Sequence, residues 1–456
     1  MHLSSIWGDY SIGSLGKEAF EFVDFLSDSG FGVWQTLPFC ITDEFNSPYK
    51  SPASFSLNPY FIDLPTLFDK GYITYRELLS ARGKIDFSCE FERLREERCP
   101  LLIKAAKRAL CSEDVRISIG EFAEKNPRIK KATEYLAEKF DTDADVWQFL
   151  HLEFFEEWMK VKKYANQNGI SIIGDVPIYV SPESADVLEN PQNFLLDGEG
   201  KPLEVAGVPP DYFSSEGQLW GNPIYDYGTM EKDSFSWWRE RIRHALSLFD
   251  GIHIDHFRGI DAFWSIPNGK DAREGRWKSG PGEKLVKAII EEAGERLIIA
   301  EDLGDIDDSV RRLISEYSLA GSRVFEFAFL GDSESVHLPH NYINNSVAYS
   351  STHDNNTLLG YLFECEEGTR RRIFEYCGYS GSDITEGERA VIRTLFSSSA
   401  GIVILPIQDV LFFGSDTRMN TPGKADGNWG FRIRREQIYS SDRAFFRYLS
   451  ALYARL

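Results

Sequence analysis

Short apolar runs that alternate with helical patterns dominate the second half of the chain. A helical pattern at 235–249 leads into an apolar run at 251–255, and helical patterns around 283–294 and 308–318 each lead into another apolar run. Strands that alternate with helices are typical of right-handed βαβ units, which build a parallel sheet. The hydrophobic pattern therefore predicts an α/β fold.

The first half of the chain adds further apolar runs. A helical pattern from Gly16 ends at Gly30, and the apolar run FGVWQTLPF follows it directly. The apolar runs across the whole chain then number eight: WQTLPF, YFIDLP, SIIGDVPIYV, GIHIDHF, RLIIAEDL, RVFEFAFL, SVAYSSTHD and GIVILPIQDV. Eight parallel strands close a (β/α)8 TIM barrel, so this is the fold that we predict. A doubly wound open sheet is the alternative, but neither G-x-G-x-x-G nor G-x-x-x-x-G-K-[ST] opens any helical pattern.

Two long segments interrupt this alternation. Residues from about 67 to 165 are mostly charged with apolar residues at helical spacing, and residues 181 to 229 show little regular pattern. Long irregular segments inside a compact domain are usually functional or disordered, and the aromatic residues of the second segment disfavour disorder. We expect one catalytic domain over residues 1–456. It would carry a mostly helical insertion at about 67–165 and a loop-rich substrate-binding insertion at about 181–229, on the C-terminal face of the barrel.

Composition narrows the possible partners and the compartment. The formal net charge is −21, from 71 acidic and 50 basic residues, which disfavours nucleic acid and anionic membranes and favours a neutral substrate. No segment approaches the roughly 18 apolar residues of a membrane span, and no secretory signal is visible, so we expect a cytoplasmic protein. The six cysteines form no C-x-x-C pair, which predicts free thiols rather than a zinc site or disulfides.

Ionisable residues crowd the end of one predicted strand. The stretch FDGIHIDHFRG, residues 249–259, is an apolar run whose carboxyl end carries His253, Asp255, His256 and Arg258. Buried parallel strands are nearly continuous apolar runs, so these side chains indicate a site at that end. Side chains alternate along a strand, which places His253 and Asp255 on the same side. An Asp that only caps the following loop is the simpler alternative.

Two more predicted strands are followed by acids. Glu301 lies near the end of the run LIIAEDL, and Asp354 lies near the end of YSSTHDN. In a barrel, both acids would lie with Asp255 at the same mouth. Carboxylates held close together repel, and one of them is forced to keep a proton. Because this arrangement is energetically unfavourable, such a cluster indicates a functional site. Paired carboxyls suit glycosidic chemistry, in which an ionised group attacks the anomeric carbon and a protonated group serves the leaving oxygen.

Aromatic residues near the predicted mouth fit a sugar substrate. The loop NSPYKSPASFSLNPYFIDL contains Tyr49, Phe55, Tyr60 and Phe61. Sugar rings have apolar C–H faces that stack on aromatic rings, so these residues are candidates for the walls of a glucan groove. Packing beneath the loop is an equal alternative.

Many motifs of the chain resemble those of one enzyme family. They are SIWGDYSIGSLG, WQTLPF, SPYKSPASFSLNPYFIDL, GDVPIYV, AGVPPDYFSSEGQLWGNPIYDY, IDHFRG, EGRWKSGPGEKL, AEDLG, LPHNY, THDNNT, PIQDVLFFGSDTRMNTPG and GNWGFR. In this order they are similar to the 4-alpha-glucanotransferases called amylomaltases or disproportionating enzymes, glycoside hydrolase family 77. The resemblance runs from residue 4 to about residue 432.

The resemblance implies a function and a set of roles. It implies transfer of α-1,4-glucan segments to glucose or another α-1,4-glucan by a retaining double displacement. Asp255 would be the nucleophile, Glu301 the general acid/base, and Asp354 the acid that binds sugar hydroxyls. The expected substrate-binding residues come from the aromatic loop, the predicted strand and the motifs. They are Tyr60, Asp175, Asp211, Tyr212, Phe213, Gln218, Trp220, His253, His256, His353 and Asn420. No cofactor and no metal are implied. For Trp220 a core position, and for His353 a supporting position, remain alternatives.

The sequence departs from the family at His253, where the family usually has Arg. An Arg side chain is permanently charged, whereas His is charged only near or below a pKa of about 6.5. We therefore expect weaker support of the ionised nucleophile, and lower or more acid-shifted activity than is usual in the family. An α-amylase-like hydrolase and a non-catalytic glucan-binding protein are the alternative functions.

Overall fold

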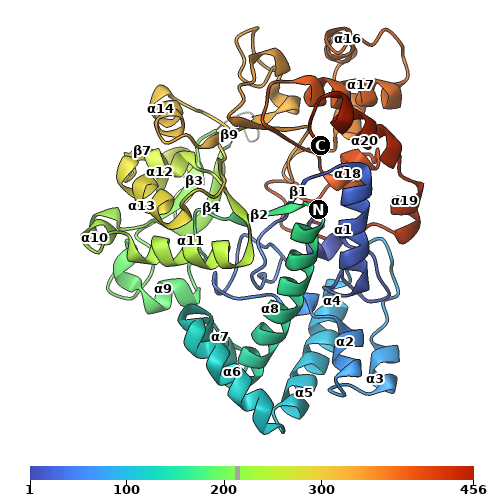
Figure 1. The fold of residues 1–456 in the computed structure, drawn as a ribbon. Helices are drawn as coiled ribbons and strands as arrows, with labels where there is room; N and C mark the ends of the chain where they lie inside the picture. The colour runs from blue at the N-terminus through green and yellow to red at the C-terminus, as the bar shows by residue number, and fades with distance from the viewer. Residues whose placement is uncertain (211–215) are drawn as a thin grey trace.

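The computed structural model describes residues 1–210 and 216–456, and a parallel sheet forms its centre (Figure 1). The sheet has seven strands in the order β1-β2-β5-β8-β9-β10-β11. All neighbouring strands are parallel. Their bounds are β1 (Val33–Gln35), β2 (Ser171–Val176), β5 (Gly251–Ile254), β8 (Ile298–Ala300), β9 (Ala320–Val324), β10 (Ser346–Tyr349) and β11 (Ile402–Ile404). The predicted α/β barrel class is confirmed.

One of the eight predicted strands is wrong. Residues 60–65, YFIDLP, fall in the 3-10 helix η2 (Pro59–Phe61) and the start of helix α2 (Leu64–Asp69). The side chain of Asn58 caps the first helix and that of Asp63 caps the second, and each helix has proline in its first turn. Proline fixes φ at a helical value and lacks the N–H that a strand would need, so these capped segments become helical.

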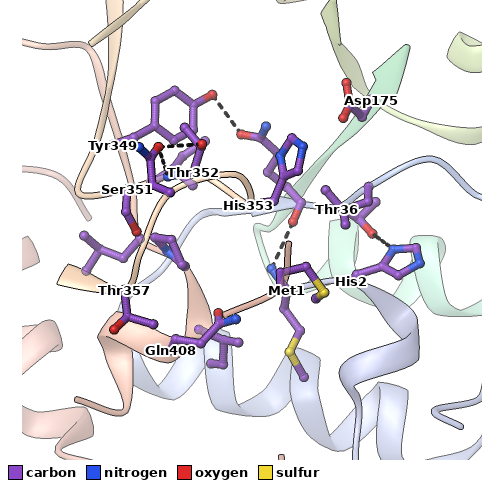
Figure 2. Close-up of a pocket in the computed structure, with 18 of the residues that line it drawn as sticks. Met1, His2, Thr36, Asp175, Tyr349, Ser351, Thr352, His353, Thr357 and Gln408 are labelled. Carbon is purple, nitrogen blue, oxygen red and sulfur yellow. Dashed lines mark hydrogen bonds between the residues drawn. The ribbon is translucent and has the colours of Figure 1, made fainter. Parts of the chain in front are cut away.

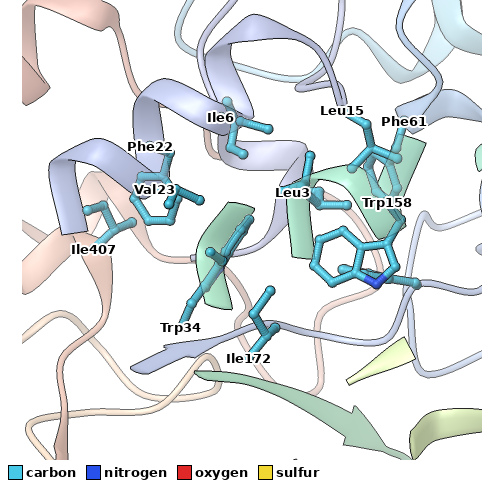
Figure 3. Packing of buried hydrophobic residues seen from close by; sticks show 14 of the residues in the cluster. Leu3, Ile6, Leu15, Phe22, Val23, Trp34, Phe61, Trp158, Ile172 and Ile407 are labelled. Atoms are coloured by element: carbon cyan, nitrogen blue, oxygen red, sulfur yellow. The ribbon is translucent and has the colours of Figure 1, made fainter. Parts of the chain in front are cut away.

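The edge strands β1 and β11 lie at a seam beside the first residues of the chain. The amino group of Met1 donates to the carbonyl of Gln35 (3.2 Å), and Nε1 of Trp34 donates to the carbonyl of Met1 (2.7 Å). Figure 3 shows Leu3 and Ile6 packed in one cluster with Trp34, and Trp158 beside it. The N-terminal segment is therefore part of the barrel core.

Arg432 connects this segment to the other end of the chain. Its guanidinium is buried and donates to the carbonyl oxygens of Ile6 (3.3 Å), Gly8 (3.2 Å) and Tyr10 (2.7 Å). A buried cation needs such acceptors, because it has left its hydration shell. The contact fixes residues near both ends of the sequence to one another.

Helices surround the sheet, and those at 17–29, 144–167, 236–248, 283–293 and 308–316 lie where the pattern predicts helices. The larger ones are α1 (Lys17–Ser29), α8 (Ala144–Gln167), α11 (Ser236–Leu248), α13 (Glu283–Ala293), α14 (Asp308–Glu316), α16 (Glu367–Tyr376), α17 (Ile384–Ser397) and α20 (Arg443–Leu452). Helix α1 ends at Gly30, whose φ of 76° is left-handed and favours glycine. Shorter helices connect them: α9 (Ala185–Glu189), α10 (Tyr227–Lys232), α12 (Arg258–Asp261), α15 (Leu358–Glu364), α18 (Ile407–Val410) and α19 (Arg435–Ser440).

A group of helices between β1 and β2 projects from the barrel, drawn in blue to teal in the lower part of Figure 1. It contains α3 (Tyr75–Ser80), α4 (Phe91–Arg93), α5 (Cys99–Ala109), α6 (Glu113–Lys125) and α7 (Pro127–Lys139). Helix α8 packs against α5, α6 and α7 and also against α1 and β2, so it joins this group to the barrel. No helix of the described ranges is long and apolar enough to cross a membrane.

A second sheet was not predicted. Its four antiparallel strands have the order β4-β3-β6-β7. They are β3 (Glu204–Val208), β4 (Gln218–Pro223), β6 (Ala262–Pro267) and β7 (Arg276–Ser279). Two of these strands belong to the segment 181–229, which the sequence pattern left irregular.

All six cysteines are free thiols, as predicted. Cys111 is exposed to solvent.

Candidate active site

Two of the three predicted acids stand at the carboxyl ends of neighbouring strands. Asp255 directly follows β5 and Glu301 directly follows β8. The backbone N–H of Asp255 donates to the carbonyl of Val176 on the next strand (3.1 Å), and that of Glu301 donates to the carbonyl of Ile254 (3.1 Å). These bonds continue the ladder of the barrel beyond the strands. The sheet therefore holds both carboxyl-bearing residues rigidly.

The third acid, Asp354, follows β10 on a loop and reaches the same groove. Asp255, Glu301 and Asp354 all line a groove with a cavity volume of about 910 Å³. The Nδ2 atom of Asn420 donates to Oδ1 of Asp354 (2.6 Å), and Nε2 of His353 lies 3.3 Å from the same oxygen. The side chain of Asp354 is 43% exposed, so it faces the groove rather than the core.

Burial and nearby carboxylates raise the pKa values of the two strand-end acids. The pKa of Asp255 is raised to about 7, first by burial and then by the charge of Asp175. The pKa of Glu301 is raised well above its usual range, first by burial and then by the carboxylates of Asp255 and Asp175. Removing water and adding negative neighbours both disfavour the ionised form. Glu301 is thus suited to hold a proton near neutral pH.

Asp409 anchors the loop that carries Asp354. Its Oδ2 accepts hydrogen bonds from the hydroxyls of Ser350 (2.6 Å) and Ser351 (3.0 Å), and its Oδ1 accepts one from the backbone N–H of Leu358 (2.8 Å). These donors lie on both sides of Asp354 in the sequence. One fully buried carboxylate on α18 therefore holds both ends of the loop.

Asp175, at the end of β2, lies opposite His253 in the parallel register. Oδ1 of Asp175 lies 2.9 Å from Nδ1 of His253, and the hydroxyl of Tyr49 donates to Oδ2 of Asp175 (2.5 Å). The ring of Tyr49 also stacks on His353, with centroids 4.9 Å apart and an angle of 12° between the planes. Tyr49 thus links the expected site residues of two strands, and it lines the groove, as expected for one of the aromatic candidates of its loop.

Part of the predicted groove wall comes from the second sheet and its surroundings. Gln218, Trp220, His256, His353 and Asn420 line the groove. Nε1 of Trp220 donates to Oε1 of Gln218 (3.1 Å), and its ring meets His256 edge-on at 4.9 Å. Trp220 is half-buried. It is therefore not a fully buried core residue, which was the alternative considered from the sequence.

Other predictions fall elsewhere. Tyr60 packs, partly buried, against the main core cluster and is not among the residues that line the groove. It belongs to the capped helix η2. Asp211, Tyr212 and Phe213 lie outside the described residues.

Trp277 was not among the site residues predicted from the sequence. It stands on β7, lines the groove, and receives the guanidinium of Arg258 at 3.7 Å from its ring centroid. The motif EGRWKSGPG, which contains it, was the available signal, but its position opposite the acids depends on a sheet that the pattern did not reveal.

A smaller cavity of about 110 Å³ lies between the groove and the barrel seam (Figure 2). Asp175, His253 and Glu301 line it, and so do His2 and Tyr349. Figure 2 shows Asp175, Thr36 and His2 on one side, Tyr349, Ser351 and Thr357 on the other, and Met1 between them. The cavity therefore places open space directly beside three ionisable groups of the site.

Comparison with known proteins gives a consistent result. The profile of the family described as 4-alpha-glucanotransferase, glycoside hydrolase family 77, matches residues 1–129 and 108–437. The 4-alpha-glucanotransferase of Aquifex aeolicus is 39% identical over 100% of this chain and 98% of its own length. The chloroplastic/amyloplastic 4-alpha-glucanotransferase of Arabidopsis thaliana is 38% identical over 100% of this chain and 85% of its own.

A solved structure is similar over the whole fold. The amylomaltase from Streptococcus agalactiae, in complex with acarbose, superposes with a TM-score of 0.94 at 32% sequence identity, covering 100% of this chain and 98% of that chain. The amylomaltase from Corynebacterium glutamicum has a TM-score of 0.80 at 17% identity, covering 99% of this chain and 74% of that chain, and shares the fold.

Proposed function

The chain belongs to the 4-alpha-glucanotransferases of glycoside hydrolase family 77, and from this membership we propose that it transfers α-1,4-glucan segments through a covalent glycosyl–Asp255 intermediate. The acceptor is glucose or another α-1,4-glucan. The observation that carries the mechanism is the placement of two strand-end carboxyls, Asp255 and Glu301, with raised pKa values in one groove. Such a pair provides an ionisable nucleophile and a proton donor.

The first displacement breaks the glycosidic bond. The Asp255 carboxylate attacks the anomeric carbon, the bond from that carbon to the leaving O4 breaks, and Glu301 gives its proton to the leaving oxygen. In the second displacement Glu301 takes the proton of an acceptor hydroxyl. That oxygen attacks the anomeric carbon and the ester bond to Asp255 breaks. Two inversions retain the α configuration.

The remaining groove residues support binding of the glucan. Asp354, positioned by Asn420, is half-exposed and offers acceptor oxygens to sugar hydroxyls. Gln218 and His256 add polar groups, and Trp220 adds an aromatic face. Such a mixture suits sugar rings, which combine apolar faces with a rim of hydroxyls. We propose maltooligosaccharides and longer α-1,4-glucans as the substrates.

We also propose that residues 1–456 form one catalytic domain. The helices of the region 67–165 would be an insertion between the first two strands. The region 181–229 would be a substrate-binding insertion, and its aromatic loop at 205–225 would supply acceptor contacts and limit the access of water, which favours transfer over hydrolysis.

Incubation with maltotriose tests the activity. Glucose, total reducing ends and longer oligosaccharides are followed together, with the Asp255→Asn variant as the control. A ladder of longer maltooligosaccharides at constant reducing ends is the expected result. Rising reducing ends without a ladder would instead identify a hydrolase, and no change in any product would reject catalysis.

The covalent step needs a separate test. The Glu301→Gln variant is mixed with α-maltotriosyl fluoride, whose leaving group needs little protonation, and the denatured protein is weighed by mass spectrometry. We expect a mass increase of one maltotriosyl unit, located by peptide mapping on Asp255. Turnover of the fluoride by this variant without any adduct on Asp255, also after rapid acid quench, would count against the intermediate.

A further inference from the structure

His253 lies between two carboxyls of the site and is fully inside the barrel. Its Nδ1 atom is 2.9 Å from Oδ1 of Asp175, and its Nε2 atom is 3.6 Å from Oε2 of Glu301. The side chain is 7% exposed. The imidazole therefore places one nitrogen against Asp175 and the other nitrogen toward Glu301.

The contact with Asp175 determines which nitrogen keeps a hydrogen. Burial would raise the pKa of Asp175, but the charge of His253, the hydrogen bond to it and the hydroxyl of Tyr49 outweigh burial, so the pKa is lowered. An ionised carboxylate only accepts hydrogen bonds. Nδ1 of His253 is thus a permanent donor to Asp175, and Nε2 is the atom that gains or loses a proton. That atom faces Glu301.

The charges around His253 favour its cationic form. Burial would lower the pKa of His253, but the charge of Asp175, its hydrogen bond and the charge of Asp255 outweigh burial, so the pKa is raised. Glu301 on the other side also has a raised pKa. Nε2 of His253 lies 3.6 Å from Oε2 of Glu301, and ionisable groups that interact at so short a distance titrate as a coupled pair.

We propose that His253 is a positioning residue that shares a proton with Glu301, so that the protonation of the imidazole controls that of the general acid/base. This inference rests on the proposed function, since it assigns a partner to Glu301 within that reaction. It is specific to this chain, because a permanently charged Arg at the same position has no proton to share.

The shared proton has a defined place in the reaction. When the shared proton passes from Glu301 to the leaving oxygen, Nε2 of His253 is left without it, so the imidazole is neutral and Glu301 is a carboxylate that can accept the proton of the acceptor hydroxyl. When the acceptor hydroxyl gives its proton to Glu301, that carboxyl becomes neutral again. His253 ends each cycle in the state in which it began, and no proton is consumed.

Other ionisable groups face this pair and are part of its titration. Asp255 lies at the end of the same strand, Tyr49 contacts Asp175 from its loop, and His353 and Asp354 lie across the groove. The cavity below is lined by His2, Tyr349 and Arg418. Burial lowers the pKa of His2 to about 3, so His2 is neutral and does not compete for the proton. Arg418 directs its guanidinium to the carbonyl of Asp354 (3.2 Å).

The cavity of about 110 Å³ beside His253 makes the matching substitution feasible. An Arg side chain at this position extends further than imidazole, and the open space adjoins Asp175 and Glu301. The His253→Arg variant can therefore keep the contact with Asp175 without displacing the neighbouring strands. The His253→Gln variant keeps a donor but carries no charge.

Proton sharing is tested first without any activity. The protein is labelled with 13C at histidine, the Cε1–H signal of His253 is assigned by its loss in His253→Gln, and its shift is followed from pH 5 to pH 10. We expect two inflections in the wild type and one in Glu301→Gln. The Glu388→Gln variant, which removes a buried carboxyl elsewhere, should keep both. A single, identical inflection in the wild type and in Glu301→Gln would overturn the proposal.

The kinetic test uses the two substitutions of His253. In His253→Arg the fixed charge favours the Glu301 carboxylate, so the alkaline limb of the kcat profile should move down by about one pH unit. In His253→Gln we expect kcat to fall roughly tenfold while KM changes less than about threefold. An unmoved alkaline limb in His253→Arg would overturn the proposal. If the wild type forms no ladder from maltotriose, the proposed function fails, and the titration still decides whether His253 and Glu301 share a proton.

Discussion

The hydroxyl of Tyr49 donates a 2.5 Å hydrogen bond to Asp175, while its ring stacks on His353. A single side chain from the loop after β1 thus contacts a residue of β2 and a residue of the loop after β10. These elements lie far apart in the sequence, and they carry the partner of His253 and the neighbour of Asp354. Tyr49 therefore fixes the relative positions of the two sides of the groove.

Replacing Tyr49 separates these two contacts. Tyr49→Phe removes the hydrogen bond and keeps the stacking, and we expect kcat/KM for maltotriose to fall about three- to tenfold, the effect of about 1 kcal/mol. Tyr49→Ala loses both contacts and should cost at least tenfold more. Initial rates of glucose release measure both. Equal rates for Tyr49→Phe and the wild type would show that the hydrogen bond does not matter to the reaction.

The pH profile should show an acid limb near the pKa of Asp255, which is raised to about 7 mainly by burial. The nucleophile must be ionised, so kcat/KM should fall about tenfold for each pH unit below that value. This direction is opposite to the acid-shifted activity that we expected from His253 alone, because the buried carboxyls outweigh the histidine. The profile is measured with maltotriose from pH 4 to pH 10, with circular dichroism as the control for unfolding. A constant rate from pH 5 to pH 7 would contradict it.

Asp409 should be needed for activity although it does not touch the groove. Asp409→Ala leaves the hydroxyls of Ser350 and Ser351 and the N–H of Leu358 without their acceptor, and we expect a loss of about 2 to 4 kcal/mol in the free energy of unfolding. The loop of Asp354 loosens as well, so kcat/KM should fall at least about tenfold. Urea unfolding and initial rates check this. The exposed Asp416→Ala is the control, and a matching loss in both variants would reject the anchoring role.

Glu388, on α17, should lower the stability of the fold at high pH. It is fully buried, neither carboxyl oxygen has a hydrogen-bond partner within the described structure, and its pKa is raised to about 9 by burial first and then by Asp409. The folded state holds a proton that the unfolded chain loses near pH 4.5, so stability falls as the pH rises from about 4.5 to about 9.

Glu388→Gln removes this dependence. The variant should gain about 1 to 3 kcal/mol over the wild type at pH 8 and little at pH 5. Urea unfolding at both values measures the difference, with the exposed Glu386→Gln as the control. A gain of the same size at pH 5 and pH 8 would mean that ionisation is not its cause.

The strands that carry the acids could be predicted because their environment leaves a simple signature. β5 and β8 are buried on both faces, so they are continuous apolar runs, and an acid that ends such a run is conspicuous. The run at 60–65 has the same composition, but capping by Asn58 and Asp63 decides in favour of helices. Local capping of this kind, rather than the apolar composition of the run, decides between helix and strand. It can be recognised in the sequence only when each capping residue is considered individually.

The groove was less predictable than the acids. Trp277 and Trp220 reach it through an antiparallel sheet whose strands come from separate parts of the chain, and pairing between distant segments leaves no local pattern. Tyr49 was one of several aromatics in its loop, and only the fold separates it from Tyr60, which packs against the core. The chemistry was therefore readable from residue types, whereas the walls required tertiary structure.

The bonds from Arg432 to the carbonyls of Ile6, Gly8 and Tyr10 have a consequence for synthesis on the ribosome. The segment that lies beside β1 is made more than 420 residues before the residue that fixes it. During elongation the seam between β1 and β11 must stay open, with apolar residues such as Leu3 and Ile6 uncovered for tens of seconds at ordinary rates of translation. Apolar surface that is exposed in this way during synthesis is the kind that chaperones shield.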